Sequence, residues 1–189
     1  MKISAFLWVL FEAYWILAAR QRLRSTESVK REPALGRAAY LSVVFTGALL
    51  LFWRNEAHAF TRRLWPESSA AVAAGLAIQL AGMVVAVCAR QVLGSNWSGR
   101  ISTGSSQELI IAGPYRYVRH PIYSGMLLAL LGATLVMGRP AAFLGFAVFV
   151  TGILIKTRRE EAALRAHFGQ AYDAYSARVP GLVPGLTHF

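Results

Sequence analysis

The segment 113–123 gathers the polar side chains best suited to bind a ligand, and it reads GPYRYVRHPIY. Pro121 suits the first turn of a helix, because its missing N–H would be unpaired there in any case. The free backbone donors of such a helix start, together with Arg116, Arg119 and His120, would suit an anionic group. The alternative is that these arginines and tyrosines anchor the chain at a membrane interface, where both residue types are common.

A second charged cluster covers residues 156–161 and reads KTRREE. A carboxylate in this cluster could bind the ammonium group of a ligand. It could equally pair with Arg158 or Arg159 as a surface salt bridge, which contributes little to stability. The residues alone leave both interpretations open.

The motifs of several common enzyme classes are missing from the sequence. There is no G-x-x-x-x-G-K-[ST] loop, no G-x-G-x-x-G after a strand and no G-x-S-x-G. The four histidines lack the spacing of metal ligands, so we expect no metal site. The single cysteine, Cys88, allows no intramolecular disulfide. ATP hydrolysis, Rossmann-type cofactor binding, hydrolase nucleophiles and zinc chemistry are therefore unsupported.

The composition indicates a membrane protein. Hydrophobic residues make up 56% of the 189 residues, charged residues only 15%, and the mean hydropathy is +0.44. The net charge is +11, but the basic residues stand between long apolar runs. Proteins that bind nucleic acid carry them on soluble faces instead. We therefore expect a membrane, and no nucleic acid, as the partner of this chain.

Five apolar segments are long enough, or nearly so, to cross a hydrocarbon layer of about 30 Å as helices. The last two are separated by Gly138–Arg139–Pro140, which predicts a tight helical hairpin. The segments are 3–19, 38–53, 70–89, 122–137 and 141–155. In the third, the row Ala73, Ala77 and Ala81 favours close helix packing in lipid.

Lys and Arg are unevenly distributed between these segments. The linkers 20–37 and 90–121 and the tail 156–189 carry 15 of them, and the opposite side carries 5. Basic residues favour the cytoplasmic side, so we expect the C-terminus in the cytoplasm and the N-terminus outside it. If the source is bacterial, the location would be the inner membrane.

The tail is expected to contain one more helix. From Thr157, apolar residues recur at helical spacing opposite charged ones, and Thr157 with Glu160 would form a capping box if the helix restarts there. The fold class is thus all-α: a polytopic membrane protein with about five transmembrane helices and a cytoplasmic amphipathic C-terminal helix. Residues 1–189 are expected to form a single domain.

Glu12 stands inside the first apolar segment. An ionisable group is costly in lipid and usually faces a cavity or a partner. Gln79, in the third apolar segment, is a possible partner. A purely structural, protonated or partnered Glu is the alternative to a functional one.

Residues 113–125 resemble the G-x-Y-x-x-x-R-H-P-x-Y-x-G signature of the isoprenylcysteine carboxyl methyltransferase family, which belongs to a wider group with phospholipid methyltransferases. The resemblance covers residues 90–185. It continues in the tail at Glu160–Glu161, Leu164, Phe168–Gly169, Tyr172, Tyr175 and Arg178–Val179–Pro180.

The resemblance implies a helical membrane fold that binds S-adenosyl-L-methionine from the cytosol without a Rossmann domain. Glu160 would contact the ammonium group of the cofactor, and its neighbour Glu161 has no assigned role. The other implied cofactor-binding residues are Gln107, Leu109, Ile110, Tyr115, His120, Pro121 and Tyr123.

The implied substrate site includes Lys156, at a place where relatives carry an arginine. A lysine cannot reproduce the planar two-point grip of arginine on a carboxylate, so the acceptor stays open. Arg90 and Trp97 would shape the entrance, or would form an interfacial turn with a Trp anchor.

The predicted function is S-adenosylmethionine-dependent methyl transfer to a lipid-like or prenylated acceptor, with a carboxylate as the favoured acceptor group, by in-line displacement at the membrane–cytosol interface. A carboxylate acceptor would need no general base. Oxygen, nitrogen and sulfur acceptors all stay open, as does the oligomeric state. The alternatives are an NADPH-dependent membrane reductase on a related helical scaffold and a non-catalytic membrane module.

Overall fold

The computed structural model describes residues 2–22, 30–31, 34–53, 59–94, 102–103 and 108–185. Over these residues the chain is helical, apart from β1 (Lys30–Arg31) and β2 (Ser102–Thr103), which pair antiparallel. The expectation of a helical fold is therefore confirmed for the described part of the chain.

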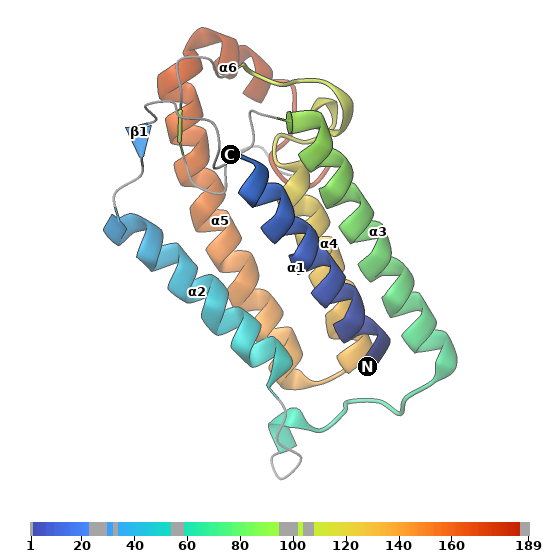
Figure 1. Ribbon diagram of the computed structural model, residues 1–189. Helices are drawn as coiled ribbons and strands as arrows, with labels where there is room; N and C mark the ends of the chain where they lie inside the picture. The colour runs from blue at the N-terminus through green and yellow to red at the C-terminus, as the bar shows by residue number, and fades with distance from the viewer. Residues whose placement is uncertain are drawn as a thin grey trace.

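Long helices run side by side along one direction, and short elements lie at their ends (Figure 1). Their bounds are α1 Lys2–Arg22, α2 Ala34–Phe52, α3 Ser69–Leu93, α4 Pro121–Met137, α5 Pro140–Phe168 and α6 Gln170–Ser176, with 3-10 turns η1 Ala59–Thr61 and η3 Gly113–Arg116. The start of α4, the end of α5 and α6 meet at the same end of the molecule (Figure 1).

The predicted hairpin between α4 and α5 is confirmed. Gly138 adopts a left-handed conformation, with φ of 57°, and its N–H donates to the carbonyl of Thr134 at 2.8 Å. Such a C-cap favours glycine because it has no Cβ. Arg139 is extended, and Pro140 begins α5 at the position where its missing N–H costs nothing.

The helices pack most closely in two pairs, α3 against α4 and α2 against α5, because glycines on one helix meet the backbone of the other. A Cβ added to Gly125 would lie 2.6 Å from both the backbone N of Ala86 and the carbonyl oxygen of Gly82. A Cβ added to Gly47 would lie 2.7 Å from the backbone N of Phe149. Both distances are far below ordinary contact, so any larger residue would force the helices apart.

The predicted packing row of α3 is wrong. Ala73, Ala77 and Ala81 are exposed, and a different face of α3 is turned towards α4. Small residues permit close packing on any face, and the glycines of the facing helix decide which face is used. The buried residues are Gly75, Gln79, Gly82, Met83, Ala86 and Ala89.

The expected helix restart at Thr157 is also wrong, because α5 continues through this point without a break. Thr157 is fully buried, and its hydroxyl donates to the carbonyl of Leu154 at 3.0 Å within the helix. The break comes at Gly169, with φ of 54°, where α6 begins. The amphipathic tail helix is therefore the last part of α5 together with α6.

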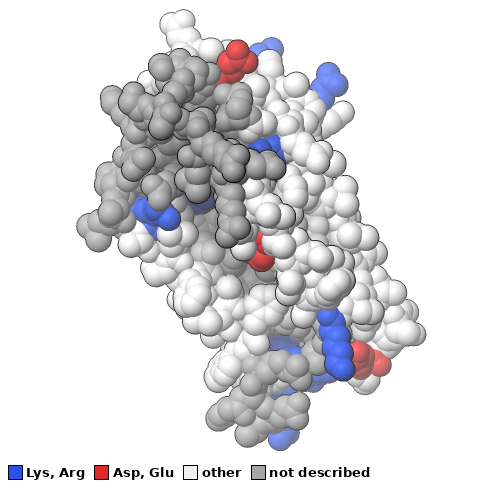
Figure 2. Space-filling view, viewed as in Figure 1, with Lys and Arg blue, Asp and Glu red and all other residues white. Residues whose placement is uncertain are grey.

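Two described helices, α3 and α5, are long and apolar enough to cross a membrane. Residues 37–52 of α2 and all of α4 are apolar but shorter. On the face shown in Figure 2, charged side chains gather towards the two ends of the molecule, and the stretch between them is largely uncharged. Five membrane crossings therefore stay a prediction.

Gln79 is not the partner of Glu12. Its amide is fully buried and pairs with Ser4: the Ser4 hydroxyl donates to Gln79 Oε1 at 2.6 Å, and Gln79 Nε2 donates to the Ser4 carbonyl at 3.0 Å. This two-bond contact joins α1 to α3 and satisfies the one amide buried between them.

Candidate functional site

A buried ionic cluster joins the start of α4 to α5. The Glu161 carboxylate accepts from Arg119 Nε at 2.8 Å and Nη2 at 2.6 Å, and His120 Nε2 lies 3.0 Å from the same oxygen. All three residues are 4–5% exposed. Buried charges occur almost only when they are paired and hydrogen-bonded, as these are. Glu161, to which the sequence assigned no role, is therefore an organising residue of this end.

The C-terminal segment closes over this cluster. Arg119 Nη1 donates to the carbonyls of Ser176 at 3.1 Å and Val179 at 2.5 Å. The backbone N–H groups of Arg119 and His120 donate to the carbonyls of residues 180 and 181 at 2.8 and 3.0 Å. Ser124 donates to the carbonyl of residue 182 at 2.6 Å.

This network leaves fewer free donors for an anionic ligand at the start of α4 than the sequence predicts. Two backbone donors and the Arg119 guanidinium already bond within the protein. Arg116 is exposed, with its guanidinium 5.9 Å from the ring centre of Tyr117. His120 Nε2 faces Glu161, so its Nδ1 is the ring atom left to meet a ligand.

Glu160, Tyr123 and Lys156 meet beside this cluster. The Tyr123 hydroxyl donates to Glu160 Oε2 at 2.7 Å. Lys156 Nζ lies 5.0 Å from the ring centre of Tyr123 and 5.6 Å from that of Tyr40, within the range of cation–π attraction. The rings of His120 and Tyr123 stack at 5.8 Å. Neighbouring carboxylates of α5 thus have different roles, because Glu160 bonds Tyr123 at the site and Glu161 bonds the buried Arg119 and His120.

Tyr115 packs in the same apolar cluster as Tyr123, and its side chain is 7% exposed. The Tyr175 hydroxyl donates to the carbonyl of Tyr115 at 2.6 Å. Burial raises the pKa of Tyr115 well above its ordinary value, and the negative charge of Glu160 raises it further. Burial also raises the pKa of Tyr175, to about 12. Both phenols are therefore neutral at physiological pH.

The structure brings together most of the residues expected from the sequence. Tyr115 packs in one apolar cluster with Ile110 and Tyr123, and Leu109 is half-buried next to them in sequence. Pro121 is buried as the first residue of α4. Arg90 Nη1 donates to the carbonyl of residue 94 at 2.9 Å, and its positive charge acts on Tyr115. Gln107 and Trp97 lie outside the described residues.

The sequence interpretation missed Tyr40 as a part of the site and gave Glu161 no role, and it expected Arg119 to bind an anionic ligand rather than Glu161. Arg119 and Glu161 belong to the quoted motifs, so their presence was visible and only their pairing was not. Tyr40 lies near the start of the second apolar segment, and its side chain is 1% exposed. An aromatic residue at the end of an apolar run normally indicates an interface anchor, and nothing local distinguishes this one.

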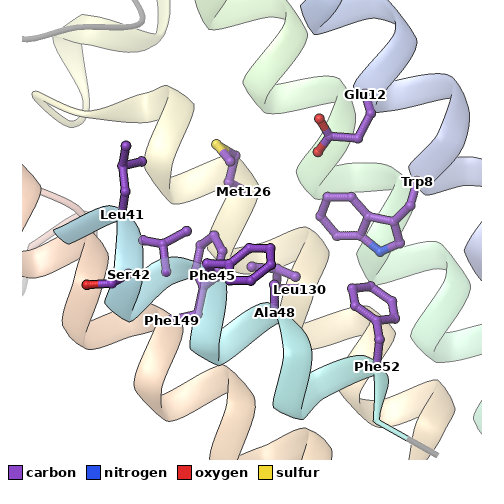
Figure 3. Close-up of a pocket in the computed structure, with 11 residues that line it drawn as sticks. Trp8, Glu12, Leu41, Ser42, Phe45, Ala48, Phe52, Met126, Leu130 and Phe149 are labelled. Atoms are coloured by element: carbon purple, nitrogen blue, oxygen red, sulfur yellow. The ribbon is translucent and has the colours of Figure 1, made fainter. Parts of the chain in front are cut away.

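An apolar groove of about 640 Å³ opens between α1 and α2 over α4 and α5 (Figure 3). Its lining residue Met126 also packs in the same apolar cluster as Tyr115 and Tyr123, so this part of the groove lies beside the site. The lining residues are Trp8, Glu12, Leu41, Ser42, Val44, Phe45, Ala48, Phe52, Met126, Leu130 and Phe149.

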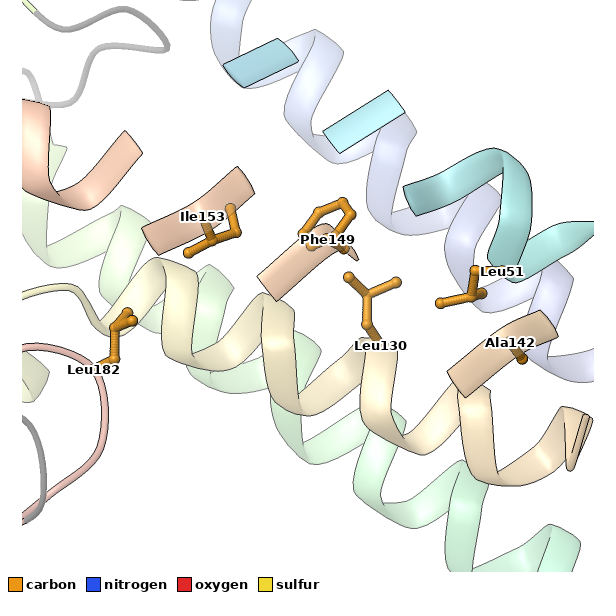
Figure 4. Packing of buried hydrophobic residues seen from close by; sticks show 6 residues of the cluster. All are labelled: Leu51, Leu130, Ala142, Phe149, Ile153 and Leu182. Carbon is orange, nitrogen blue, oxygen red and sulfur yellow. The ribbon is translucent and has the colours of Figure 1, made fainter. Parts of the chain in front are cut away.

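The floor of this groove is part of the main apolar cluster of the protein. Leu130 and Phe149 line the groove and also pack with the remaining members of the cluster, shown in Figure 4. Leu182, at the end of the C-terminal segment, is 4% exposed in the same cluster. The segment that closes over the ionic cluster is thus held by apolar packing as well.

The site residues of η3, α4 and α5 lie within a region that matches a known protein family. A sequence model described as phospholipid methyltransferase matches residues 70–171. The chain is 34% identical over 86 residues to protein-S-isoprenylcysteine O-methyltransferase B of Arabidopsis thaliana, covering 45% of this chain and 44% of that protein. It is 47% identical over 73 residues to methanethiol S-methyltransferase 2 of Bradyrhizobium diazoefficiens, covering 38% and 27%.

Among solved structures, the eukaryotic intramembrane Ras methyltransferase, isoprenylcysteine carboxyl methyltransferase, shares the fold. The TM-score is 0.53 at 22% identity, over 80% of this chain and 52% of that chain. The chain spans about half, or less, of the length of these relatives.

Proposed function

Because the chain belongs to the phospholipid methyltransferase family, we propose that it transfers a methyl group from S-adenosylmethionine to an acceptor that carries an apolar chain. One observation carries this proposal: Glu160, Tyr123 and Tyr115 meet beside the apolar groove, whose lining residue Met126 packs in one cluster with both tyrosines. A polar site beside an apolar groove suits a reaction between a polar cofactor and a lipid-like acceptor.

The residues present suit S-adenosylmethionine. Glu160 offers a carboxylate to its ammonium group, and the faces of Tyr115 and Tyr123 suit a cation or an adenine ring. His120 turns Nε2 towards Glu161, so its Nδ1 would donate to the carboxylate of the cofactor when the ring carries both protons. Leu109 and Ile110 would add apolar contacts, Gln107 a polar contact, and the buried Pro121 would shape the wall. When bound, the cofactor supplies an electrophilic methyl group on a positively charged sulfur.

Residues of this chain would bind the acceptor, orient it and exclude water. Lys156, between two tyrosine rings, would attract a carboxylate of the acceptor, and Arg90 and Trp97 would shape the entrance. A carboxylate nucleophile needs no base, so the site has to align the two partners and exclude water. Orientation alone can lower the barrier by up to about 7–11 kcal/mol. Tyr115 and His120 are largely buried, so this side of the site excludes water.

A thiol acceptor is the second candidate, and one observation favours it. The methanethiol S-methyltransferase has higher local identity to this chain than the Arabidopsis relative. Against a very small acceptor stands the 640 Å³ groove, a volume typical of sites for larger ligands. Because of this groove, we favour an acceptor that carries both a carboxylate and an apolar chain over a small thiol.

The proposed setting is a membrane crossed by five helices, with the site at the cytoplasmic end. The apolar α3 and α5 and the 15-to-5 distribution of Lys and Arg support this arrangement. The ionic cluster, Glu160 and the C-terminal segment all lie at the end assigned to the cytoplasm, where a soluble cofactor is available.

Binding of S-adenosylhomocysteine to the purified protein tests the proposed cofactor. Addition of the ligand at about a hundred times its dissociation constant should stabilise the protein by about 2.7 kcal/mol, seen as a raised thermal midpoint in detergent. NADPH at the same concentration should give no shift. A shift with NADPH and none with S-adenosylhomocysteine would favour the reductase and refute methyl transfer.

A further inference from the structure

Glu12 is the one charged residue among those that line the apolar groove. Its carboxylate projects from α1 into the space between α1 and α2, above the indole of Trp8 (Figure 3). Met126 lines the same part of the groove and lies about one turn from Tyr123. The carboxylate therefore stands in the part of the groove that lies beside the proposed methyl-transfer site, where Met126 packs with Tyr115 and Tyr123.

Within the described residues, no hydrogen bond or ion pair to the Glu12 carboxylate is present. The nearby polar groups are used elsewhere: Gln79 bonds Ser4, and the Ser42 hydroxyl donates to the carbonyl of residue 39 at 2.9 Å. Trp8 Nε1 is buried without a hydrogen-bond partner in the described structure. The groove thus holds an acceptor group and a donor group that the rest of the described chain does not satisfy.

Glu12 is exposed towards the open groove and is not buried within the helix bundle. An ionisable group inside a membrane-spanning helix usually faces a cavity or a partner and serves a ligand. A carboxylate only accepts hydrogen bonds, so a complementary ligand group must donate them. A protonated amine does so and also cancels the charge. A carbonyl group does neither. The surrounding walls, which include Phe45, Ala48 and Phe52, suit a hydrocarbon chain.

We propose that the groove binds a single-chain amphiphile whose protonated amine pairs with Glu12 and whose chain packs along Phe45, Ala48 and Phe52. This deepens the proposed function and rests on it for one point, that the bound amphiphile is the methyl acceptor. Glu12 is then a specificity-determining residue, which selects, among acceptors with a carboxylate and an apolar chain, those that also carry an amine.

Calorimetric titration of the protein in zwitterionic lipid nanodiscs tests this inference, with dodecylammonium and dodecanol as probes. The wild-type protein should bind dodecylammonium about ten- to a hundredfold more tightly than dodecanol, as a charge-assisted hydrogen bond implies. Glu12→Gln keeps the size of the side chain and should remove this preference. Glu67→Gln, an exposed carboxylate in the loop before α3, should retain it. Ala48→Trp should weaken binding of both probes by filling the groove.

The same preparations should be titrated with S-adenosylhomocysteine, so that failure of the two ideas can be told apart. Loss of the amine preference in Glu12→Gln with unchanged S-adenosylhomocysteine binding supports the inference. Equal wild-type binding of both probes, or an unchanged preference in Glu12→Gln, overturns it. Absence of S-adenosylhomocysteine binding in the wild-type protein would instead count against the proposed function.

Discussion

Removing the Glu161 carboxylate is expected to destabilise the protein by about 3–5 kcal/mol, the usual cost of leaving a buried charge unpaired. Glu161 accepts two bonds from Arg119 at 2.6 and 2.8 Å and faces His120 Nε2 at 3.0 Å. In Glu161→Ala the Arg119 guanidinium stays buried without its counter-ion. The variant in which Arg119→Met and Glu161→Leu are combined removes both charges, so it should be more stable than Glu161→Ala.

Equilibrium unfolding in mixed detergent micelles, followed by circular dichroism, gives the free energies. Tryptic cleavage after the exposed Arg178 gives a local measure, because Arg119 also holds the carbonyls of Ser176 and Val179. Cleavage should become faster in Glu161→Ala. The exposed pair Arg165–Asp173, with an N–O distance of 2.8 Å, is the matched control, and Asp173→Ala should change little. If Glu161→Ala behaved like Asp173→Ala, the ionic cluster would not organise this end of the protein.

Three further predictions concern packing, topology and pH. Gly125→Ala should cost about 1–3 kcal/mol, since its Cβ would lie 2.6 Å from the backbone of α3, whereas Ala81→Val on the exposed face should be nearly neutral in the same unfolding assay. A reporter that works only in the cytoplasm should be active when it is fused to the C-terminus. A translocated C-terminal reporter would refute the orientation. The free energy of unfolding should fall between about pH 10 and about pH 12. An unfolded tyrosine loses its proton near the lower value and folded Tyr175 near the upper one. Tyr175→Phe should make this fall smaller.

The sequence predicts those features of the fold that local patterns determine. The break at 138–140 is visible because glycine and proline restrict the backbone directly, and the apolar segments are visible because lipid-facing and core-facing helices need apolar side chains. The face of α3 that packs against α4 is not visible in this way. Ala73, Ala77 and Ala81 form a regular small-residue row, but the contact depends on where Gly125 and its neighbours lie on another helix.

The site shows the same division. The motif residues identify where Tyr115, Tyr123 and Glu160 stand in the chain, and the structure adds that they meet. Glu161 and Arg119 are 42 residues apart in the sequence, so the local sequence around each predicts only a charged helix end and not their pairing. Adjacent carboxylates look equivalent in the sequence, yet Glu161 is buried against Arg119 and His120, and Glu160 bonds a tyrosine at the site.

This difference changes how the role of Glu160 must be tested. Glu161→Gln cannot serve as a neutral neighbour control, because it disturbs Arg119 and His120. Glu67→Gln is a better control, since its side chain is 54% exposed in the loop before α3. Tyr123→Phe is an informative second variant, because it removes the hydrogen bond that orients the Glu160 carboxylate.

Calorimetric titration of Glu160→Gln with S-adenosylhomocysteine tests the central claim most directly. The substitution preserves size but removes the charge that would meet the ammonium group of the ligand. Losing a partly buried charged hydrogen bond costs about 1.5–3 kcal/mol, so affinity should fall roughly ten- to a hundredfold while the protein stays folded. Tyr123→Phe should show a smaller loss and Glu67→Gln none. Wild-type affinity in a folded Glu160→Gln protein would contradict the assignment of the cofactor to this site.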